Sequence, residues 1–159
     1  MRLLVSITLI GILLSCNSTQ SLKDHVYQRR YFPPELNSLY LGMPQAQALK
    51  VRPPAALLDS TTTAWTTFHE LIGRDDIKEI VYYFDKKESP ILYGFVVEYE
   101  SSQIRQKEMA WRYGKPNHEK TEWKKDSKEG FQLHIWAEDT RLFIFGEISG
   151  TTKPKATKH

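Results

Sequence analysis

Cys16 is the only cysteine in the chain, so its thiol has no partner for an intramolecular disulfide. It follows Arg2 and an apolar run from Leu3 to Leu14. A charged start and a short apolar core are typical of a secretory signal peptide, and the run is shorter than the roughly 20 residues that a membrane-spanning helix needs. The sequence therefore predicts export, and it leaves the Cys16 thiol available for another reaction.

Leu13-Leu14-Ser15-Cys16 resembles the lipobox of bacterial lipoproteins, with Leu14 where a small residue is usual. The resemblance implies lipid transfer to the Cys16 thiol, cleavage after Ser15 and acylation of the new amino terminus. Two or more acyl chains anchor a protein stably, at roughly 0.8 kcal/mol per buried CH₂. We therefore predict a signal peptide over 1–15 and a lipidated tether over 16–25. The alternative is an ordinary secreted protein whose cysteine lies near the cleavage site by chance.

The histidines do not follow a metal-binding pattern. His69-Glu70 begins like the helix of a zinc protease, but Gly73 stands where the second histidine is required. No other histidine lies at metal-ligand spacing from a second His or Cys; these residues are His25, His118, His134 and His159. The sequence therefore predicts neither a metal nor a cofactor, and it places His134 on the polar face of a strand.

Catalytic motifs are also absent from the sequence. It contains no Gly-x-Ser-x-Gly nucleophile motif and no glycine-rich phosphate loop. The carboxylates that could form an acid/base pair are expected at strand ends or on alternate faces, in solvent; these are Glu98, Glu100, Glu138, Asp139 and Glu147. We therefore expect no enzymatic activity. The alternative, an envelope hydrolase, requires a cleft in which Asp, Glu or His side chains converge.

Length and charge limit the remaining possibilities. The 159 residues suit one domain, which we place at 26–150, and residues 151–159 read as a disordered basic tail. The net charge is +3, and 26% of the residues are charged with both signs well mixed. This pattern does not indicate a nucleic-acid-binding protein.

The candidate residues must be positioned by the secondary structure, and the sequence predicts alternating helical and extended segments. Helices are expected at 39–51 and 101–113, the second capped by Ser101 or Ser102 and closed by Gly114. Strands are expected at 79–85, 91–100, 119–124, 131–137 and 141–149, while 64–71 alternates as a strand does and 59–63 reads as a polar loop. Residues 26–32 are either an edge strand or a packed arm. The expected fold class is α+β, with antiparallel sheet and helices packed on one face.

Two strands have informative side-chain patterns. Phe95, Val97 and Tyr99 should share one face of their strand. The segment 141–149 is apolar on both faces, which predicts a central position in the sheet. The aromatic residues are mostly expected in the core, although some could be exposed as binding anchors; they are Trp111, Trp123, Trp136, Tyr82, Tyr83, Tyr93 and Tyr99.

The order of elements suggests an internal repeat. Arg52-Pro53 and Lys115-Pro116 each follow a predicted helix, and each is followed by a Trp and a hairpin. The chain could therefore contain two α-β-β(-β) repeats.

Leu41-Gly42-Met43, followed by a helix, resembles the opening of the SmpA/OmlA-type (BamE-like) lipoprotein domains, with Pro44 in place of their usual Ser. Those domains pack helices on a three-stranded antiparallel sheet, and their two-repeat relatives include secreted inhibitors of β-lactamase. The chain also resembles small uncharacterised lipoproteins of spirochaetes through Leu41 to Met43, Arg52-Pro53 and Tyr113 to Asn117. The resemblance implies a lipid-anchored envelope module without enzymatic activity.

We therefore expect a binding or scaffold module, anchored through Cys16 to a bacterial membrane. The outer membrane is favoured, and its periplasmic and surface faces both remain open. The expected partners are the membrane itself and another envelope or host protein. A surface adhesin or inhibitor is a special case of this expectation.

Overall fold

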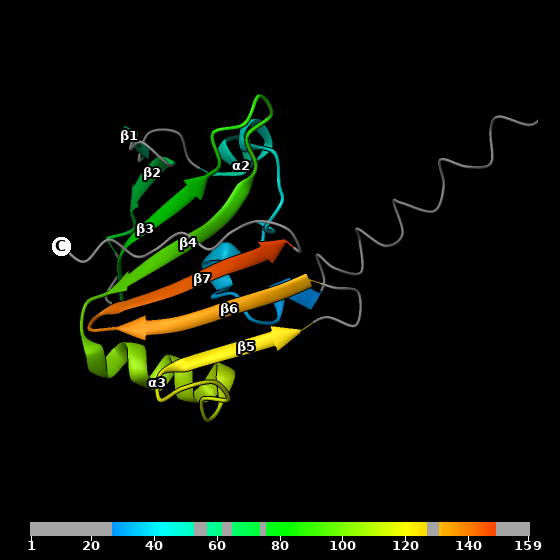
Figure 1. Cartoon of the computed structure of the whole chain (residues 1–159). Helices are drawn as coiled ribbons and strands as arrows, with labels where there is room; N and C mark the ends of the chain where they lie inside the picture. Colours follow the sequence, from blue (N-terminus) through cyan, green and yellow to red (C-terminus); the bar gives the residue numbers. More distant parts are fainter. Residues whose placement is uncertain (1–26, 53–56, 62–64, 74–75, 127–130, 149–159) are drawn as a thin grey trace, which may run out of the picture.

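A computed structural model of the chain describes residues 27–52, 57–61, 65–73, 76–126 and 131–148 (Figure 1). The predicted signal peptide, the tether with Cys16 and the basic tail lie outside these residues, as do Lys153, Lys155 and Lys158.

The described elements follow the predicted order of helix, strands, helix and strands. They are η1 (Pro34–Leu36), α2 (Gln45–Val51), β1 (Leu57–Thr61), β2 (Thr66–Leu71), β3 (Ile77–Phe84), β4 (Leu92–Tyr99), α3 (Ser102–Tyr113), β5 (Glu122–Asp126), β6 (Phe131–Glu138) and β7 (Arg141–Ile148). The predicted α+β class with an antiparallel sheet is confirmed.

The described strands form one seven-stranded sheet in the order β1-β2-β3-β4-β7-β6-β5. Every neighbouring pair is antiparallel. Two meanders, β1 to β4 and β5 to β7, therefore meet at their last strands (Figure 1). At this junction Gly94 of β4 pairs with Phe145 of β7, and Glu98 pairs with Arg141. The central position predicted for 141–149 is confirmed.

One face of the sheet supplies the hydrophobic core. Because side chains alternate between the faces of a strand, every second residue points into this core. The buried sheet residues of the core include Ile80, Tyr82, Phe84, Phe95, Val97, Tyr99, Trp123, Leu133, Ile135, Leu142 and Ile144. Ala48 of α2 and Met109 and Tyr113 of α3 belong to the same cluster. The shared face predicted for Phe95, Val97 and Tyr99 is thus confirmed.

Helix α3 begins and ends where the sequence predicts. The Ser101 hydroxyl oxygen accepts a hydrogen bond from the backbone N–H of Ile104 at 3.2 Å, which satisfies a free donor of the first turn. Gly114 follows the last residue with φ of 69°, a conformation that glycine adopts without steric strain. Arg112 and Glu108 form an ion pair one turn apart on this helix.

The segment before α2 is a packed arm and not an edge strand. Residues 27–29 are helical. Phe32 is fully buried and meets the ring of Phe95 edge to face, with centroids 4.8 Å apart. The Gln28 side-chain oxygen accepts a hydrogen bond from Leu41 N at 2.7 Å. The arm is therefore part of the core and not an addition to the sheet edge.

The helix predicted over 39–51 is shorter than expected. It begins only at Gln45, because the residues before it bond to the sheet. Gly42 N donates to Leu92 O at 2.7 Å, and Leu92 N donates to Met43 O at 2.8 Å. Gly42 has φ of 92°, which takes the chain out of helical geometry.

Two further expectations were wrong in their boundaries. The polar loop expected over 59–63 overlaps β1, whose backbone pairs with β2 from Leu57↔Glu70 to Thr61↔Thr66. The strand expected at 119–124 is displaced to Glu122–Asp126, because Glu119 stands in a turn with φ of 54°.

Candidate functional site

The face of the sheet opposite the core carries a continuous group of aromatic rings. We call this group the aromatic face; it consists of Trp65, Tyr83, Tyr93, Trp136, Phe143 and Phe145. None of the six belongs to the core cluster. Tyr93 is buried and the other five are half-buried. The alternation that places Tyr82 and Ile144 in the core places Tyr83, Phe143 and Phe145 on this second face.

The rings contact one another across strands that are distant in sequence. Trp65, just before β2, stacks on Tyr93 with centroids 5.0 Å apart. Tyr93 and Tyr83 both meet Phe145, at 6.0 Å and 5.3 Å. Trp136 lies 5.4 Å from Phe145. The contacts therefore run without a break from the β2 side of the sheet to β6.

The most nearly parallel contact is between Trp136 and Phe143. Their centroids are 4.8 Å apart and their planes differ by 7°. Burial raises the pKa of Tyr83, with Glu79 raising it further and Arg141 opposing both, so Tyr83 stays neutral at physiological pH. The group therefore presents flat, uncharged surface.

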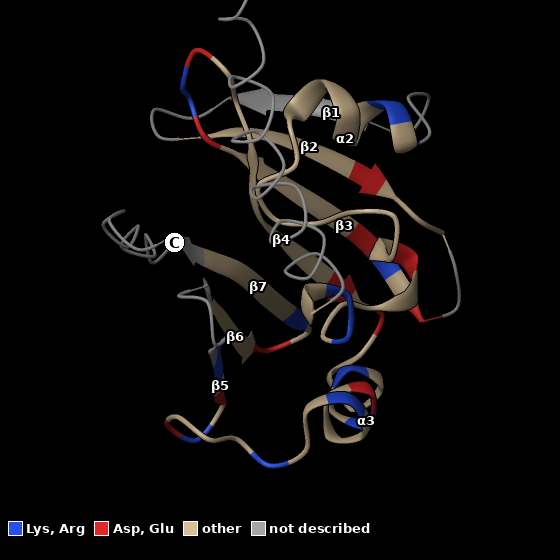
Figure 2. Cartoon of the chain, turned by 90° about the vertical axis from the view of Figure 1, so that its right-hand side faces the viewer, with Lys and Arg blue, Asp and Glu red and all other residues tan. Residues whose placement is uncertain are grey.

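Charged groups border the aromatic face. Glu98 accepts from Arg141 Nε and from Lys78 Nζ, each at 3.3 Å. On the β2 side, His69 Nδ1 lies 2.6 Å from Glu79 Oε1. Figure 2 shows that charged residues concentrate at strand ends and on α3. An apolar centre with a polar border is the usual anatomy of a protein–protein interface.

A second cluster lies at the β5 side of the sheet. His134 Nε2 is 2.9 Å from Glu122 Oε2, and His118 Nε2 is 3.9 Å from the same oxygen. Single ligand atoms of His118, Glu119 and Glu122 all lie within 4.8 Å of one another. The His134 ring also packs against Trp136, with centroids 4.9 Å apart. The sequence alone does not connect His134 with the nearby His118, Glu119 and Glu122, because His134 is brought to Glu122 only by the pairing of β5 with β6.

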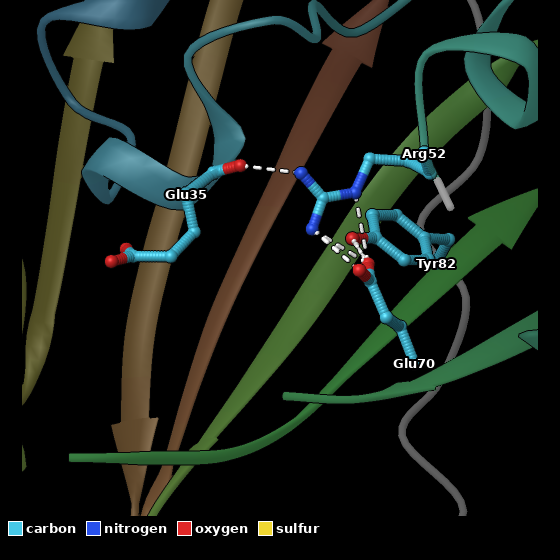
Figure 3. Close-up of polar contacts among 4 residues, drawn as sticks. All are labelled: Glu35, Arg52, Glu70 and Tyr82. Carbon is cyan, nitrogen blue, oxygen red and sulfur yellow. Dashed lines mark hydrogen bonds and ion pairs between the residues drawn. The ribbon is translucent and has the colours of Figure 1, made fainter. Parts of the chain in front are cut away.

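The buried Glu70 carboxylate makes contacts that are structural. The Arg52 guanidinium donates to Glu70 Oε2 through Nε at 2.9 Å and through Nη2 at 2.7 Å, and Nη2 also donates to Oε1 at 2.8 Å (Figure 3). Its Nη1 donates to the Glu35 carbonyl oxygen at 2.7 Å. The Tyr82 hydroxyl donates to the same carboxylate. Burial and this hydrogen bond raise the pKa of Tyr82. Both carboxylate oxygens of Glu70 are thus occupied, and the group ties η1, α2, β2 and β3 together.

The carboxylates considered as catalytic candidates do not converge among the described side chains. Glu98 is paired with basic residues, while Glu100, Glu138 and Asp139 are exposed. The side chain of Glu147 lies outside the description.

A cavity of about 430 Å³ lies between α3 and β5. Its lining includes Arg105, Lys115, Lys120, Met109 and Trp123, and contains no Asp, Glu or His. The acidic cleft that a hydrolase would require is therefore not found at this cavity.

Comparisons with known proteins return no match, whether to family models, curated proteins or solved structures. Within the described residues no helix has the length and apolar character needed to cross a membrane.

Proposed function

We propose that this protein is a lipid-anchored, non-enzymatic module of the bacterial cell envelope that binds another protein through its aromatic face. The observation that carries the proposal is the unbroken series of ring contacts from Trp65 to Trp136 on the face opposite the core. Trp and Tyr are the residues most enriched among binding hot spots, because they bury large area with little loss of side-chain entropy.

The arrangement of the helices supports this choice of face. Ala48 of α2 and Met109 of α3 both join the core cluster, while the aromatic rings do not. In our proposal the chain is two α-β-β(-β) repeats whose helices cover one face of a shared sheet. The other face of the sheet is then available to a partner. Because β4 pairs with β7, this face continues from one proposed repeat to the other.

The anchor in this proposal is the Cys16 thiol, followed by the tether over 16–25. A lipid anchor restricts the protein to a membrane surface and raises its local concentration near other envelope proteins. The test compares native protein with Cys16→Ala in mass and in detergent partitioning. A native mass of residues 16–159 plus lipid, with partitioning lost in the variant, is expected. A lipid-free mass or unaltered partitioning would overturn the anchor.

Binding through the aromatic face has its own test. A photo-crosslinking amino acid replaces Tyr83 in one version and Trp111 in a control version, because Trp111 is 76% exposed on α3, away from the aromatic face. In living cells the Tyr83 position should give a discrete crosslinked product that Trp136→Ala abolishes, and the Trp111 position should not. Equal products from both positions, or a product insensitive to Trp136→Ala, would contradict the proposal.

The alternative of an envelope hydrolase has no comparable support among the described side chains. An adhesin or inhibitor of host molecules remains a special case of the binding module. It requires that the protein be displayed on the outer surface of the cell.

A further inference from the structure

We propose that His118, Glu119, Glu122 and His134 form a site for a late first-row divalent metal ion of the zinc type. The inference is independent of the binding role proposed for the aromatic face. It starts from the convergence of two imidazoles on one carboxylate oxygen, Glu122 Oε2, at 2.9 Å and 3.9 Å.

The distances suit a bound ion. Metal–ligand bonds of about 2.0–2.1 Å in a tetrahedral site place neighbouring ligand atoms roughly 3.3 Å apart. The two nitrogen-to-oxygen distances lie on either side of that value. Glu119 completes the set, because one of its oxygens lies within 4.8 Å of the ligand atoms of His118 and Glu122. His134 joins this group through Glu122 Oε2, the oxygen that both imidazoles approach.

The backbone holds these donors in place. Asn117 N and His118 N both donate to Glu122 O, at 3.2 Å and 3.1 Å, which closes the turn that carries Glu119. The Asn117 side chain bonds both N–H and C=O of Lys124 at 2.8 Å. The turn is therefore fixed to β5, while His134 is supplied by the paired strand β6.

The donor chemistry selects the metal. Two imidazole nitrogens with carboxylate oxygens match zinc and its neighbours in the first transition row, whereas calcium and magnesium prefer oxygen ligands alone. His118 and Glu122 are only partly buried, which leaves a path for the ion. The His134 ring is held against Trp136, so its orientation is restricted before any ion binds.

The test is calorimetric titration of Zn²⁺ into the untagged full chain in detergent, with Cys16→Ala in every sample so that no thiol competes. We expect one ion per chain, and a loss of at least about tenfold in affinity for His118→Ala and for His134→Ala. Glu119→Gln should weaken binding while leaving the His134–Glu122 contact in place. Excess Ca²⁺ should not displace zinc.

His69→Ala is the matched control, because His69 is also a partly exposed histidine paired with a glutamate. It should bind zinc as the parent does. Circular dichroism of each metal-free variant confirms that it is folded. Absence of zinc binding in the parent, or unchanged affinity in either His118→Ala or His134→Ala, would overturn the site.

Discussion

The ring of Phe145 fills the space that a side chain on Gly94 would occupy. A Cβ atom at Gly94 would lie 2.3 Å from Cδ1 of Phe145, well inside van der Waals contact. The two residues are register partners of the central strands β4 and β7. The absence of a side chain at Gly94 thus allows the Phe145 ring to lie over the middle of the sheet. Glycine is required at position 94 because of this ring.

Gly94→Ala should therefore destabilise the protein by about 1–3 kcal/mol, the usual range for overpacking. Chemical denaturation followed by circular dichroism measures the loss. Phe145→Ala removes the clashing ring, so the double variant should lose less stability than the two single variants added together. Simple additivity would show that the ring does not restrict this position.

Glu70→Ala should be among the most damaging single substitutions in the described chain. Glu70 is 3% exposed, and its removal leaves the Arg52 guanidinium buried without its carboxylate. Loss of one partner of such a pair typically lowers the free energy of unfolding by about 3–5 kcal/mol. Lys87→Ala is the contrast. The Lys87 side chain is 64% exposed where it pairs with Asp85, so its loss should change stability by less than about 1 kcal/mol. Equal effects in thermal melts would refute the structural role of Glu70.

Ser101→Ala should weaken α3 by about 1 kcal/mol, because the first turn loses the acceptor for Ile104 N. Ser101→Asp should restore most of that stability, since a carboxylate also caps. Ser102→Ala is the neighbouring control and should have little effect. If the two alanine variants melt together, Ser101 is not the effective cap.

Tyr99→Phe tests a buried hydroxyl for which the described residues provide no hydrogen-bond partner. At neutral pH the variant should be at least as stable as the parent, to within about 1 kcal/mol, because no protein hydrogen bond is lost. Burial, assisted by Glu108, raises the pKa of Tyr99 in the folded protein.

The sign of the pH dependence follows from that raised pKa. Above about pH 10 the unfolded chain releases the tyrosine proton and the folded chain retains it, so the free energy of unfolding falls as pH rises. Tyr99→Phe should make this decline shallower in urea titrations between neutral and alkaline pH. An unchanged slope would show that Tyr99 ionises as readily in the folded protein as in the unfolded one.

Features that depend on local chemistry could be predicted from the sequence. Ser101 and Gly114 bound α3, and the apolar alternation of 141–149 indicates a central strand. Features set by distant partners could not. Residues 59–61 are polar and were expected in a loop, yet they belong to β1 because their backbone pairs with β2. The region 39–43 looks helical, yet the backbones of Gly42 and Met43 bond to Leu92 of β4.

The candidate sites divide in the same way. Trp136 and Tyr83 could be named as possible binding residues because aromatic residues favour strands and interfaces. The contacts between the rings depend on the order of strands in the sheet. The residue pattern of a single strand does not reveal that order. The approach of His134 to Glu122 likewise depends on the pairing of β5 with β6, whereas His118 reaches Glu122 through a local turn.

The position of β7 has a consequence for how the chain is made. The central seam of the sheet joins β4 to β7, the last strand described, so β4 has one edge unpaired until β7 is in place. An apolar strand with a free edge readily pairs with other chains. A chain interrupted before Arg141 would retain that edge permanently and should associate with other chains, so early termination would produce an aggregating fragment and not a smaller folded protein.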